Sequence, residues 1–224
     1  MNSRFSFVKM KSLKVRKVDC CSIDAADIPA LFASEQVPYH TIGSVNWPSC
    51  YPYLPDVSFA AAHNGDSILL HYKVSEDSVK GDFDMDFANV WEDSCCEFFV
   101  APADDRQYYN IEFNCVGALY FCVGMGRACR QRASGEVLDS IGRWTSLGRS
   151  AIGLKSERCD WESALVLPVK AFFAHSVRLE GAEMKCNFYK CGNTDNKHYV
   201  SYYPISTPAP DFHRPEFFGK IEFE

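Results

Sequence analysis

Short segments of strand-like character recur along most of the chain and constrain its fold more than any other feature. They are rich in β-branched and aromatic residues, and turns rich in Gly, Asn and Asp separate them. They span residues 57–62, 67–74, 95–100, 108–114, 118–123, 144–147, 161–167, 184–189 and 219–223. The first two flank the sequence HNGD at 63–66, a turn that predicts a β-hairpin.

Helical signals are few by comparison. One short helix is expected over Asp24–Ala33, with Asp24 as its N-cap, and another over Val169–Ala174, directly after a proline. Many strands with a few short helices predict an all-β fold, an antiparallel β-sandwich or jelly roll. With 224 residues and 47% hydrophobic content, the chain is expected to form a single domain over residues 1–224, in which 1–18 is a basic N-terminal segment.

The charge distribution argues against binding to nucleic acid. The formal net charge is −6, whereas proteins that bind nucleic acid independently of sequence rely on a basic surface. The segment 1–18 is the exception, because every charged residue before Asp19 is Lys or Arg. Such a run favours a solvated tail and strand edge over a polyanion site. No apolar run approaches the ~20 residues of a membrane span, so no membrane partner is expected.

The chain has eleven cysteines, and an odd number cannot all form disulfides with one another. No CxxC pair is present, and the spacing of Cys186 and Cys191 matches no common zinc motif. Several cysteines lie within strand-like segments, which favours reduced, buried thiols that pack as small hydrophobic groups. Because no apolar stretch of signal-peptide type follows the basic start, we expect a cytoplasmic, reducing location.

The segment Tyr108–Asn114 alternates between two kinds of side chain. One face carries Tyr109, Ile111 and Phe113, and the other carries Tyr108, Asn110, Glu112 and Asn114. Since alternate residues of a strand share a face, the second set forms a row of donors and acceptors at ~6.6–6.8 Å steps. A concave face of this kind suits a sugar, while a flat one is an ordinary solvated face. The pattern alone leaves both interpretations open.

Two further residues stand out near the strand at 95–100. Trp91 is expected at a loop–strand junction, either in the core or on the rim of a cavity. Glu97 interrupts an otherwise apolar strand, and a carboxylate in such a place needs a partner or a wet groove. It is therefore a better candidate for ligand contact than Glu92 or Asp93, which are expected to cap a loop.

Other chemistry has weaker support in the sequence. Three acids alternate in Gly81–Asp86, but Phe87 and Asp93 stand where an EF-hand needs Gly and Glu. This leaves a calcium site of another kind or a solvated loop. Acids are plentiful enough for a glycosidase-like pair, although nothing in the sequence fixes two of them at the required separation. The six histidines are scattered without the spacing of metal ligands.

Several segments together resemble the family 9 carbohydrate-binding modules, which belong to the wider group of DOMON-like sandwiches. The similarity covers roughly residues 40 to 224, and the W…DS…E block joined to the RPE-x-FG ending is its most specific part. The matching segments are WEDSCCEFF at 91–99, YNIEFN at 109–114, WESALVLP at 161–168, NFY at 187–189 and FHRPEFFG at 212–219.

The resemblance implies a β-sandwich with a concave site that holds a sugar between two aromatic rings. The rings fall on Trp91 and Phe212, and the family's hydrogen-bonding glutamate falls on Glu97. The family also has a basic side chain on the central strand, where this chain has Glu112, so His213 and Arg214 are the expected sources of positive charge. Structural calcium occurs in the family, and no other cofactor is implied.

These observations favour a module that binds a mono- or oligosaccharide. The alternative is a glycan-active enzyme of glycoside hydrolase type that uses Glu97 and Glu112. A haem or redox role, known among DOMON-like sandwiches, has the least support, because the methionines and histidines show no axial pairing. The sequence does not set the oligomeric state. The candidate ligand-binding residues are Trp91, Glu97, Asn110, Glu112, Asn114, Phe212, His213 and Arg214.

Overall fold

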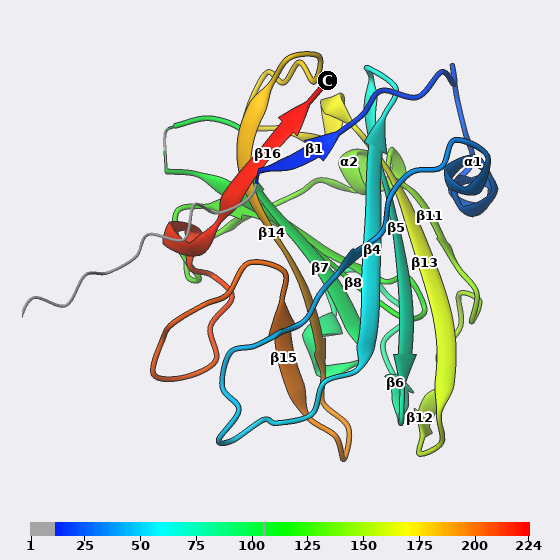
Figure 1. The fold of residues 1–224 in the computed structure, drawn as a ribbon, viewed down its shortest axis with the longest axis vertical. Coiled ribbons are helices and arrows are strands. Elements are labelled where there is room, and N and C mark those ends of the chain that lie inside the picture. The colour runs from blue at the N-terminus through cyan, green and yellow to red at the C-terminus, as the bar shows by residue number, and fades with distance from the viewer. Residues whose placement is uncertain (1–11, 105) are drawn as a thin grey trace, which may run out of the picture.

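The computed structural model describes residues 12–104 and 106–224, in which two sheets pack face to face (Figure 1). The larger sheet has nine strands, in the order β1-β16-β14-β7-β8-β9-β10, with β15 beside β14 and β3 beside β15. Its strands are β1 (Leu13–Val15), β3 (Ser44–Val45), β7 (Cys95–Ala101), β8 (Tyr108–Asn114), β9 (Leu119–Gly124), β10 (Gln131–Arg132), β14 (Glu183–Gly192), β15 (His198–Ser201) and β16 (Gly219–Phe223).

The second sheet has five strands in the order β11-β13-β5-β4-β2, and two short strands pair separately as β12-β6. The strands of these two sheets are β2 (His40–Thr41), β4 (Asp56–His63), β5 (Ser67–Glu76), β6 (Val79–Gly81), β11 (Gly142–Thr145), β12 (Gly153–Lys155) and β13 (Cys159–Pro168). The predicted hairpin at 63–66 is the turn between β4 and β5. The prediction of an all-β sandwich with a few short helices is confirmed.

The structure differs from the sequence prediction in a few elements. Strand β1 pairs with β16 in parallel, whereas every other strand pair is antiparallel among the described residues. The expected helix at 24–33 is a 3-10 turn followed by α1, and the one at 169–174 is a single 3-10 turn. The helical elements are α1 (Ile28–Ser34), α2 (Gly135–Asp139), η1 (Ala25–Asp27), η2 (Val90–Glu92), η3 (Val169–Ala171) and η4 (Pro215–Phe217).

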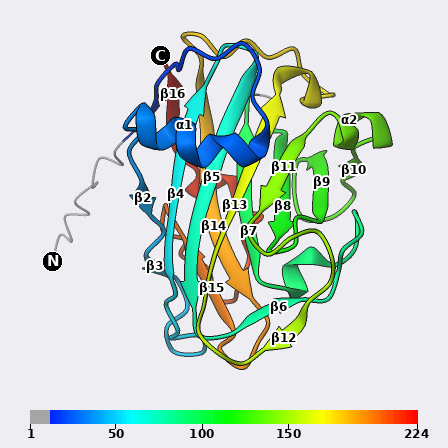
Figure 2. The ribbon, with the colours of Figure 1, turned by 90° about the vertical axis from the view of Figure 1, so that its right-hand side faces the viewer.

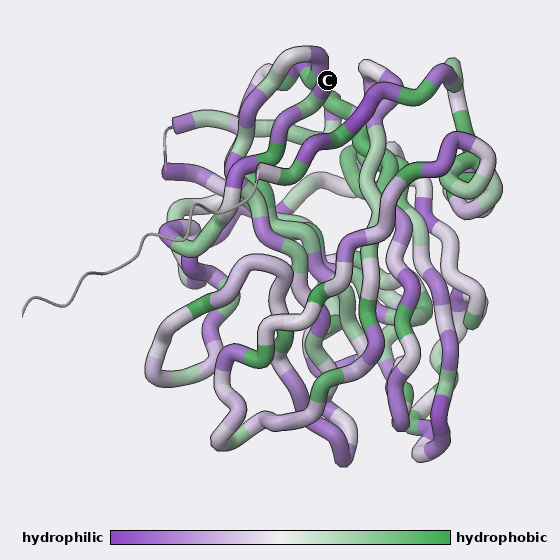
Figure 3. Tube along the Cα trace, viewed as in Figure 1, coloured by the Kyte–Doolittle hydropathy of each residue, from purple (hydrophilic) through white to green (hydrophobic). Residues whose placement is uncertain are grey.

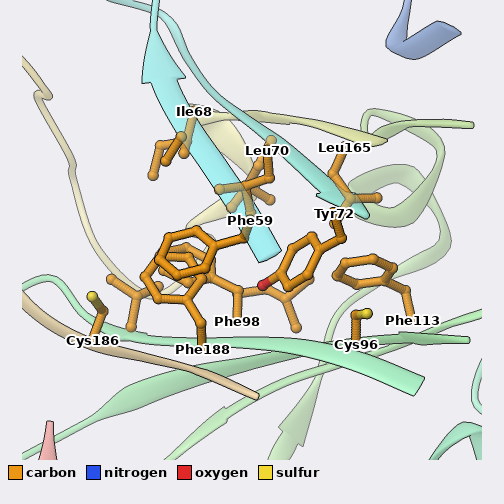
Figure 4. Packing of buried hydrophobic residues seen from close by; sticks show 14 of the residues in the cluster. Phe59, Ile68, Leu70, Tyr72, Cys96, Phe98, Phe113, Leu165, Cys186 and Phe188 are labelled. Carbon is orange, nitrogen blue, oxygen red and sulfur yellow. The ribbon is translucent and has the colours of Figure 1, made fainter. Parts of the chain in front are cut away.

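The main core lies between the two sheets and is built around stacked aromatic rings. The Phe188 ring on β14 stacks on Phe59 of β4, with centroids 3.7 Å apart, and on Phe98 of β7, with centroids 4.8 Å apart. Figure 4 shows Phe59 and Tyr72 projecting from one sheet toward Phe98 and Phe188 of the other. These rings are buried completely, and each contributes roughly 1.5–3 kcal/mol of hydrophobic stabilisation.

Helix α1 covers the outer face of the five-stranded sheet. It lies across β4, β5 and β13 in Figure 2, and its Ile28 and Phe32 are buried against small residues of those strands. Ala60, Ala62 and Ala164 give the room for this close approach. The apolar side of this short helix thus gives the sheet a second buried face.

The outer face of the nine-stranded sheet is covered by loops rather than by a helix. A second apolar cluster forms there, in which Phe99 and Tyr108 from the strands meet Trp47 and Phe212 from loops. The segments before β4 and before β16 meet over this face, since the Trp47 and Phe212 rings lie 6.2 Å apart and Trp47 Nε1 donates to Thr207 O. Figure 3 shows hydrophobic residues along the central strands and more hydrophilic ones along the peripheral loops.

The basic N-terminal segment is described only from residue 12, so Arg4, Lys9 and Lys11 lie outside the described residues. The described part forms β1, and its basic side chains form ion pairs with acids elsewhere. Arg16 pairs with Glu35 at 2.7 Å, and Lys17 pairs with Glu180 at 2.8 Å. This part of the segment is therefore a charged sheet edge.

All eleven cysteines are free thiols, and six of them are buried. Cys96, Cys115 and Cys122 lie in the interior, as their strand-like surroundings predicted. Among the described residues, none of the helices has the length and apolar character to cross a membrane.

Candidate functional site

A cavity of about 350 Å³ lies over the outer face of the nine-stranded sheet, between the sheet and its covering loops. It brings together six of the eight candidate residues from sequence positions as far apart as Trp91 and His213. Its lining consists of Trp91, Glu97, Asn110, Glu112, Tyr120, Arg127, Cys129, Arg130, Cys191, Tyr199, Pro210, Asp211, Phe212 and His213.

The floor of the cavity consists of polar side chains on neighbouring strands. Glu97 on β7 lies directly opposite Glu112 on β8, and Asn110 lies two residues from Glu112 on the same face. All three are nearly inaccessible to solvent, with Asn110 0%, Glu97 3% and Glu112 4% exposed. The alternation predicted for 108–114 is confirmed, but its polar face is buried under loops rather than solvated.

A chain of hydrogen bonds fixes this floor. Arg130 Nε donates to Asn110 Oδ1 at 2.8 Å, and Asn110 Nδ2 donates to Glu112 Oε1 at 2.7 Å. The guanidinium also donates to Tyr108 O at 2.7 Å and lies over the Tyr108 ring, 4.3 Å from its centroid. These three interactions hold Arg130 in place, and the first of them also sets the orientation of the Asn110 amide.

The two carboxyl groups of the floor resist ionisation. Burial is the main cause that raises the pKa of Glu112 to about 7, and the Asn110 hydrogen bond and Arg130 act in the opposite direction. Burial also raises the pKa of Glu97 well above its usual value, and the neighbouring Cys191 and Glu112 raise it further. Two facing carboxyl groups repel one another when both are ionised, which adds to the rise in the pKa of Glu97.

Trp91 forms one wall of the cavity. It lies in the 3-10 turn η2, which is anchored by the buried Val90, and its own side chain is 38% exposed. Its ring contacts Tyr120 edge to face, with centroids 5.1 Å apart. Asp93 follows the turn and accepts hydrogen bonds from the backbone N–H groups of residues 82 and 83. The expectation that Asp93 caps a loop is confirmed.

Phe212 lines the cavity from the loop that precedes β16. Its ring stacks on Tyr189 at 4.3 Å with an interplanar angle of 11°, and it meets Tyr199 edge to face. This packing leaves Phe212 only 8% exposed. Phe212 is consequently a rigid surface, whereas the Trp91 ring is the more accessible of the two.

Asn114 and Arg214 were candidates that the structure places outside the cavity lining. Asn114 is buried and its amide donates to Phe83 O at 2.6 Å and to Asp93 Oδ2 at 2.8 Å. It therefore holds the loop that carries Trp91. Arg214 points to the exterior, where it pairs with Glu216 at 2.5 Å. Its Nη1 also lies 3.9 Å from Asp211, which lines the cavity, and the role of Arg214 as a ligand contact stays a prediction.

The positive charge of the cavity comes from residues that the sequence analysis missed. Burial, together with Arg130 and Arg127, lowers the pKa of His213 to about 3, so this imidazole is neutral. Its Nδ1 lies 2.9 Å from the Tyr108 hydroxyl. Arg127 and Arg130 supply the cations instead, and they lie in the loop after β9. The three arginines at 127, 130 and 132 were the available signal, but only the fold places them beside β8.

The acids at 82, 84 and 86 face separate partners. Asp82 lies 3.1 Å from Lys80 Nζ, Asp84 accepts from Ala151 N at 3.3 Å, and Asp86 pairs with Arg143 at 2.5 Å. The structural calcium inferred from the resemblance stays a prediction. Among the described residues, the side chains grouped closely enough to share a metal ion are Cys95, Glu97 and Cys191.

The cavity thus combines aromatic walls with a hydrogen-bonding floor. Aromatic faces contact apolar C–H surfaces. Asn110, Glu112 and Arg130 offer an amide, a carboxyl group and a guanidinium, in that order, within one small space. A molecule with an apolar face and a rim of hydroxyl groups matches this arrangement.

Solved structures share the fold of this chain. The chain is similar to a putative carbohydrate-binding protein from Bacteroides uniformis ATCC 8492, with 45% identity, a TM-score of 0.93, and coverage of 96% of this chain and 99% of that one. A family 9 carbohydrate-binding module from Caldicellulosiruptor kristjanssonii, in complex with glucose, shares the fold at 10% identity and a TM-score of 0.59, with 96% of each chain covered.

A family 9 carbohydrate-binding module from the same organism, in complex with cellotriose, gives a TM-score of 0.60 at 10% identity, covering 96% of this chain and 94% of that one. A search of curated proteins found no match. The family model described as carbohydrate-binding family 9 matches residues 26–223, which include every strand of both sheets except β1 and all residues that line the cavity. The chain therefore belongs to carbohydrate-binding family 9.

Proposed function

We propose that this chain binds a mono- or oligosaccharide in the cavity beneath Trp91, and that it does so without hydrolysing the ligand. The observation that carries the proposal is the convergence of aromatic walls and a buried polar floor in one cavity of about 350 Å³. The family match supports the ligand class, and the glucose and cellotriose complexes of the Caldicellulosiruptor module make these two sugars the first to test.

Trp91 and Phe212 are the proposed stacking surfaces. Trp91 is accessible and can lie against a pyranose face, while Phe212 is held by Tyr189 and can serve as a fixed opposing surface. Tyr120 and Tyr199 extend the aromatic lining. Rigid rings lose little conformational entropy on binding, which favours recognition of a neutral ligand.

The floor is proposed to hold the sugar hydroxyls. Glu112 and Glu97 hydrogen-bond to the hydroxyl groups through their carboxyl groups, and Arg130 and Asn110 keep the Glu112 carboxyl group in a fixed geometry. A fixed set of donors and acceptors of this kind selects for hydroxyl positions.

The position of the carboxyl groups supports binding rather than hydrolysis. Glycosidases place two carboxyl groups on either side of the scissile bond. Glu97 and Glu112 instead lie side by side on adjacent strands and form one surface. Glu112 is also tied to Asn110, with His213 Nε2 3.9 Å from its carboxyl oxygen. We therefore propose that both residues bind the ligand and take no part in bond cleavage.

The test is calorimetric titration of the purified protein with glucose, cellotriose and a panel of other sugars. Trp91→Ala should weaken binding at least ~10-fold, which corresponds to ~1.4 kcal/mol. Trp144→Ala is the matched control, because Trp144 is a partly buried tryptophan on β11 of the other sheet and should leave the affinity unchanged.

Equal affinities of the wild type and Trp91→Ala for a confirmed ligand would place the binding site elsewhere. The same sugars should be assayed for reducing-end release. Turnover that disappears in Glu97→Gln would replace the proposal with the glycoside hydrolase alternative.

A further inference from the structure

We propose that Cys95, Cys191 and Glu97 form a binding site for a thiophilic divalent cation of the zinc class at the floor of the cavity. The three side chains come from two neighbouring strands, β7 and β14, and the proposal rests on their geometry, their donor atoms and their burial. It is independent of the proposed carbohydrate function, since it concerns a metal ion that binds in the absence of sugar.

Strand register brings the three side chains together. Cys95 and Glu97 are two residues apart on β7 and therefore share its outer face. Cys191 on β14 lies directly opposite Cys95. Cross-strand neighbours have Cβ atoms roughly 4.5–5.5 Å apart, which is close enough for two side chains to converge on one ion. The ion would thus bridge two strands of a rigid sheet.

The distances between the donor atoms match a tetrahedral site. One ligand atom from each of the three residues lies within 4.8 Å of the other two, and Cys191 Sγ is 3.3 Å from Glu97 Oε1. Zn–S bonds of about 2.3 Å in a tetrahedron place two sulfur atoms about 3.8 Å apart and a sulfur and an oxygen about 3.5 Å apart. The 3.3 Å between Cys191 Sγ and Glu97 Oε1 is close to the second of these values.

The donor atoms select the kind of metal. Calcium and magnesium take oxygen ligands, whereas thiolate sulfur favours zinc and other soft cations. Two sulfurs and one carboxylate oxygen therefore point to zinc. The two thiols and the Glu97 carboxyl group release their protons to solvent when they become ligands, and their three negative charges then exceed the charge of a divalent ion by one.

Burial and access are both suited to such a site. Cys95 is 0%, Cys191 2% and Glu97 3% exposed, so little water competes for the donors. Glu97 and Cys191 nevertheless line the cavity, through which an ion can enter. Three protein ligands leave a fourth position directed to the cavity, the arrangement of zinc sites that also bind water or a second molecule.

The experiment uses cobalt(II) as a spectroscopic probe for the zinc position, under a non-thiol reductant. A background with Cys21, Cys50 and Cys129 changed to Ser removes the exposed thiols. One equivalent of cobalt should give thiolate charge-transfer absorption and the strong visible bands of tetrahedral cobalt, and zinc should displace it. Cys95→Ala and Cys191→Ala should abolish these bands.

Two further variants separate a ligand from a structural residue. Glu97→Gln should weaken cobalt binding at least ~10-fold, since even partners outside the coordination sphere are worth about 10–100-fold in metal affinity. Cys96→Ala is the matched control, because Cys96 is equally buried and adjacent on β7 but faces the sandwich core. It should keep both the stoichiometry and the spectrum.

The proposal is overturned if the background protein shows no spectrum of tetrahedral, thiolate-bound cobalt. This measurement does not depend on the folding of any variant in the protein core. A spectrum that survives in folded Cys191→Ala, or a Cys95–Cys191 disulfide that persists under reductant, also overturns it. Titration of glucose and cellotriose into metal-free protein tests the carbohydrate function separately, so the failure of one proposal is distinguishable from the failure of the other.

Discussion

The two faces of the nine-stranded sheet are buried to a similar degree but differ in chemistry. On β8, Ile111 and Phe113 face the sandwich core, while Asn110 and Glu112 on the opposite face form the floor of the cavity. Each of these residues is at most 4% exposed. Burial alone therefore does not distinguish a face that stabilises the fold from a face that recognises a ligand.

The difference between the faces lies in what burial does to each side chain. Removing an apolar ring from water stabilises the folded protein, whereas removing a carboxyl group from water opposes its ionisation. The raised pKa values of Glu97 and Glu112 record that penalty. The polar face is thus maintained at the expense of stability, and the predictions below separate its contribution from that of the apolar face.

The largest effect is expected on the apolar face. Phe188→Ala removes a ring that stacks on both Phe59 and Phe98, so the free energy of unfolding should fall by ~3–5 kcal/mol. Urea denaturation measures this change. Phe188→Leu is the control and should lose much less, and equal losses in the two variants would contradict a role for cavity formation in this core.

The carboxyl groups of the polar face should make the stability of the protein depend on pH. Because the pKa of Glu112 is about 7 in the folded protein and about 4.3 in an unfolded chain, the unfolded chain releases this proton first as the pH rises. The free energy of unfolding should therefore fall between about pH 4.3 and 7.

Glu112→Gln removes this ionisable group, so the fall in the free energy of unfolding over this pH range should be smaller by up to ~3 kcal/mol. Urea denaturation of both proteins at a series of pH values measures the difference. The raised pKa of Glu97 leaves a residual slope in the variant. Parallel pH profiles for the wild type and Glu112→Gln would show that Glu112 is not desolvated in solution.

Asn114 links the polar face to the loop that carries Trp91. Asn114→Ala leaves the Asp93 carboxylate and Phe83 O without their amide partner, so stability should fall by ~2 kcal/mol. Sugar affinity should fall as well, because the Trp91 loop loses its attachment. Trp91→Ala provides the contrast, with weaker binding at nearly unchanged stability. A stable Asn114→Ala protein would argue against this linkage.

The smallest effect is expected at the exposed end of the same region. Arg214→Ala breaks a surface ion pair with Glu216, and such pairs are worth ~0–1 kcal/mol. Sugar affinity should change by less than about twofold, whereas Arg130→Ala should weaken binding because it releases Asn110. Calorimetry on both variants tests the difference. A large loss in Arg214→Ala alone would restore it as a ligand contact.

The longer strands could be predicted from the sequence because their pattern spans several residues. The segment 108–114 contains three full alternations, and its two faces were assigned correctly. Strands β3, β10 and β12 have only two or three residues, so they show no periodicity of their own. The parallel pairing of β1 with β16 was also beyond the sequence, because it joins the two ends of the chain.

The candidate site was predicted in part for a similar reason. Trp91, Glu97 and Phe212 followed from a family resemblance carried by local segments. Arg130 and Cys191 belong to segments that carry no such signal, and they reach the cavity only because β9 and β14 flank the central strands. Arg214 does not line the cavity, because its sequence position next to His213 says nothing about the competing carboxylate of Glu216.

The sequence by itself determined the strand-rich architecture, the alternation of β8 and the aromatic character of the site, since these depend on residues close together in the chain. Only the tertiary structure decided that the polar face of β8 is buried, that the cations come from Arg127 and Arg130, and that Cys95 and Cys191 are neighbours. The burial of the site side chains, the pKa of their ionisable groups and their approach to one another depend on contacts between distant segments. Strand order and loop packing set those contacts.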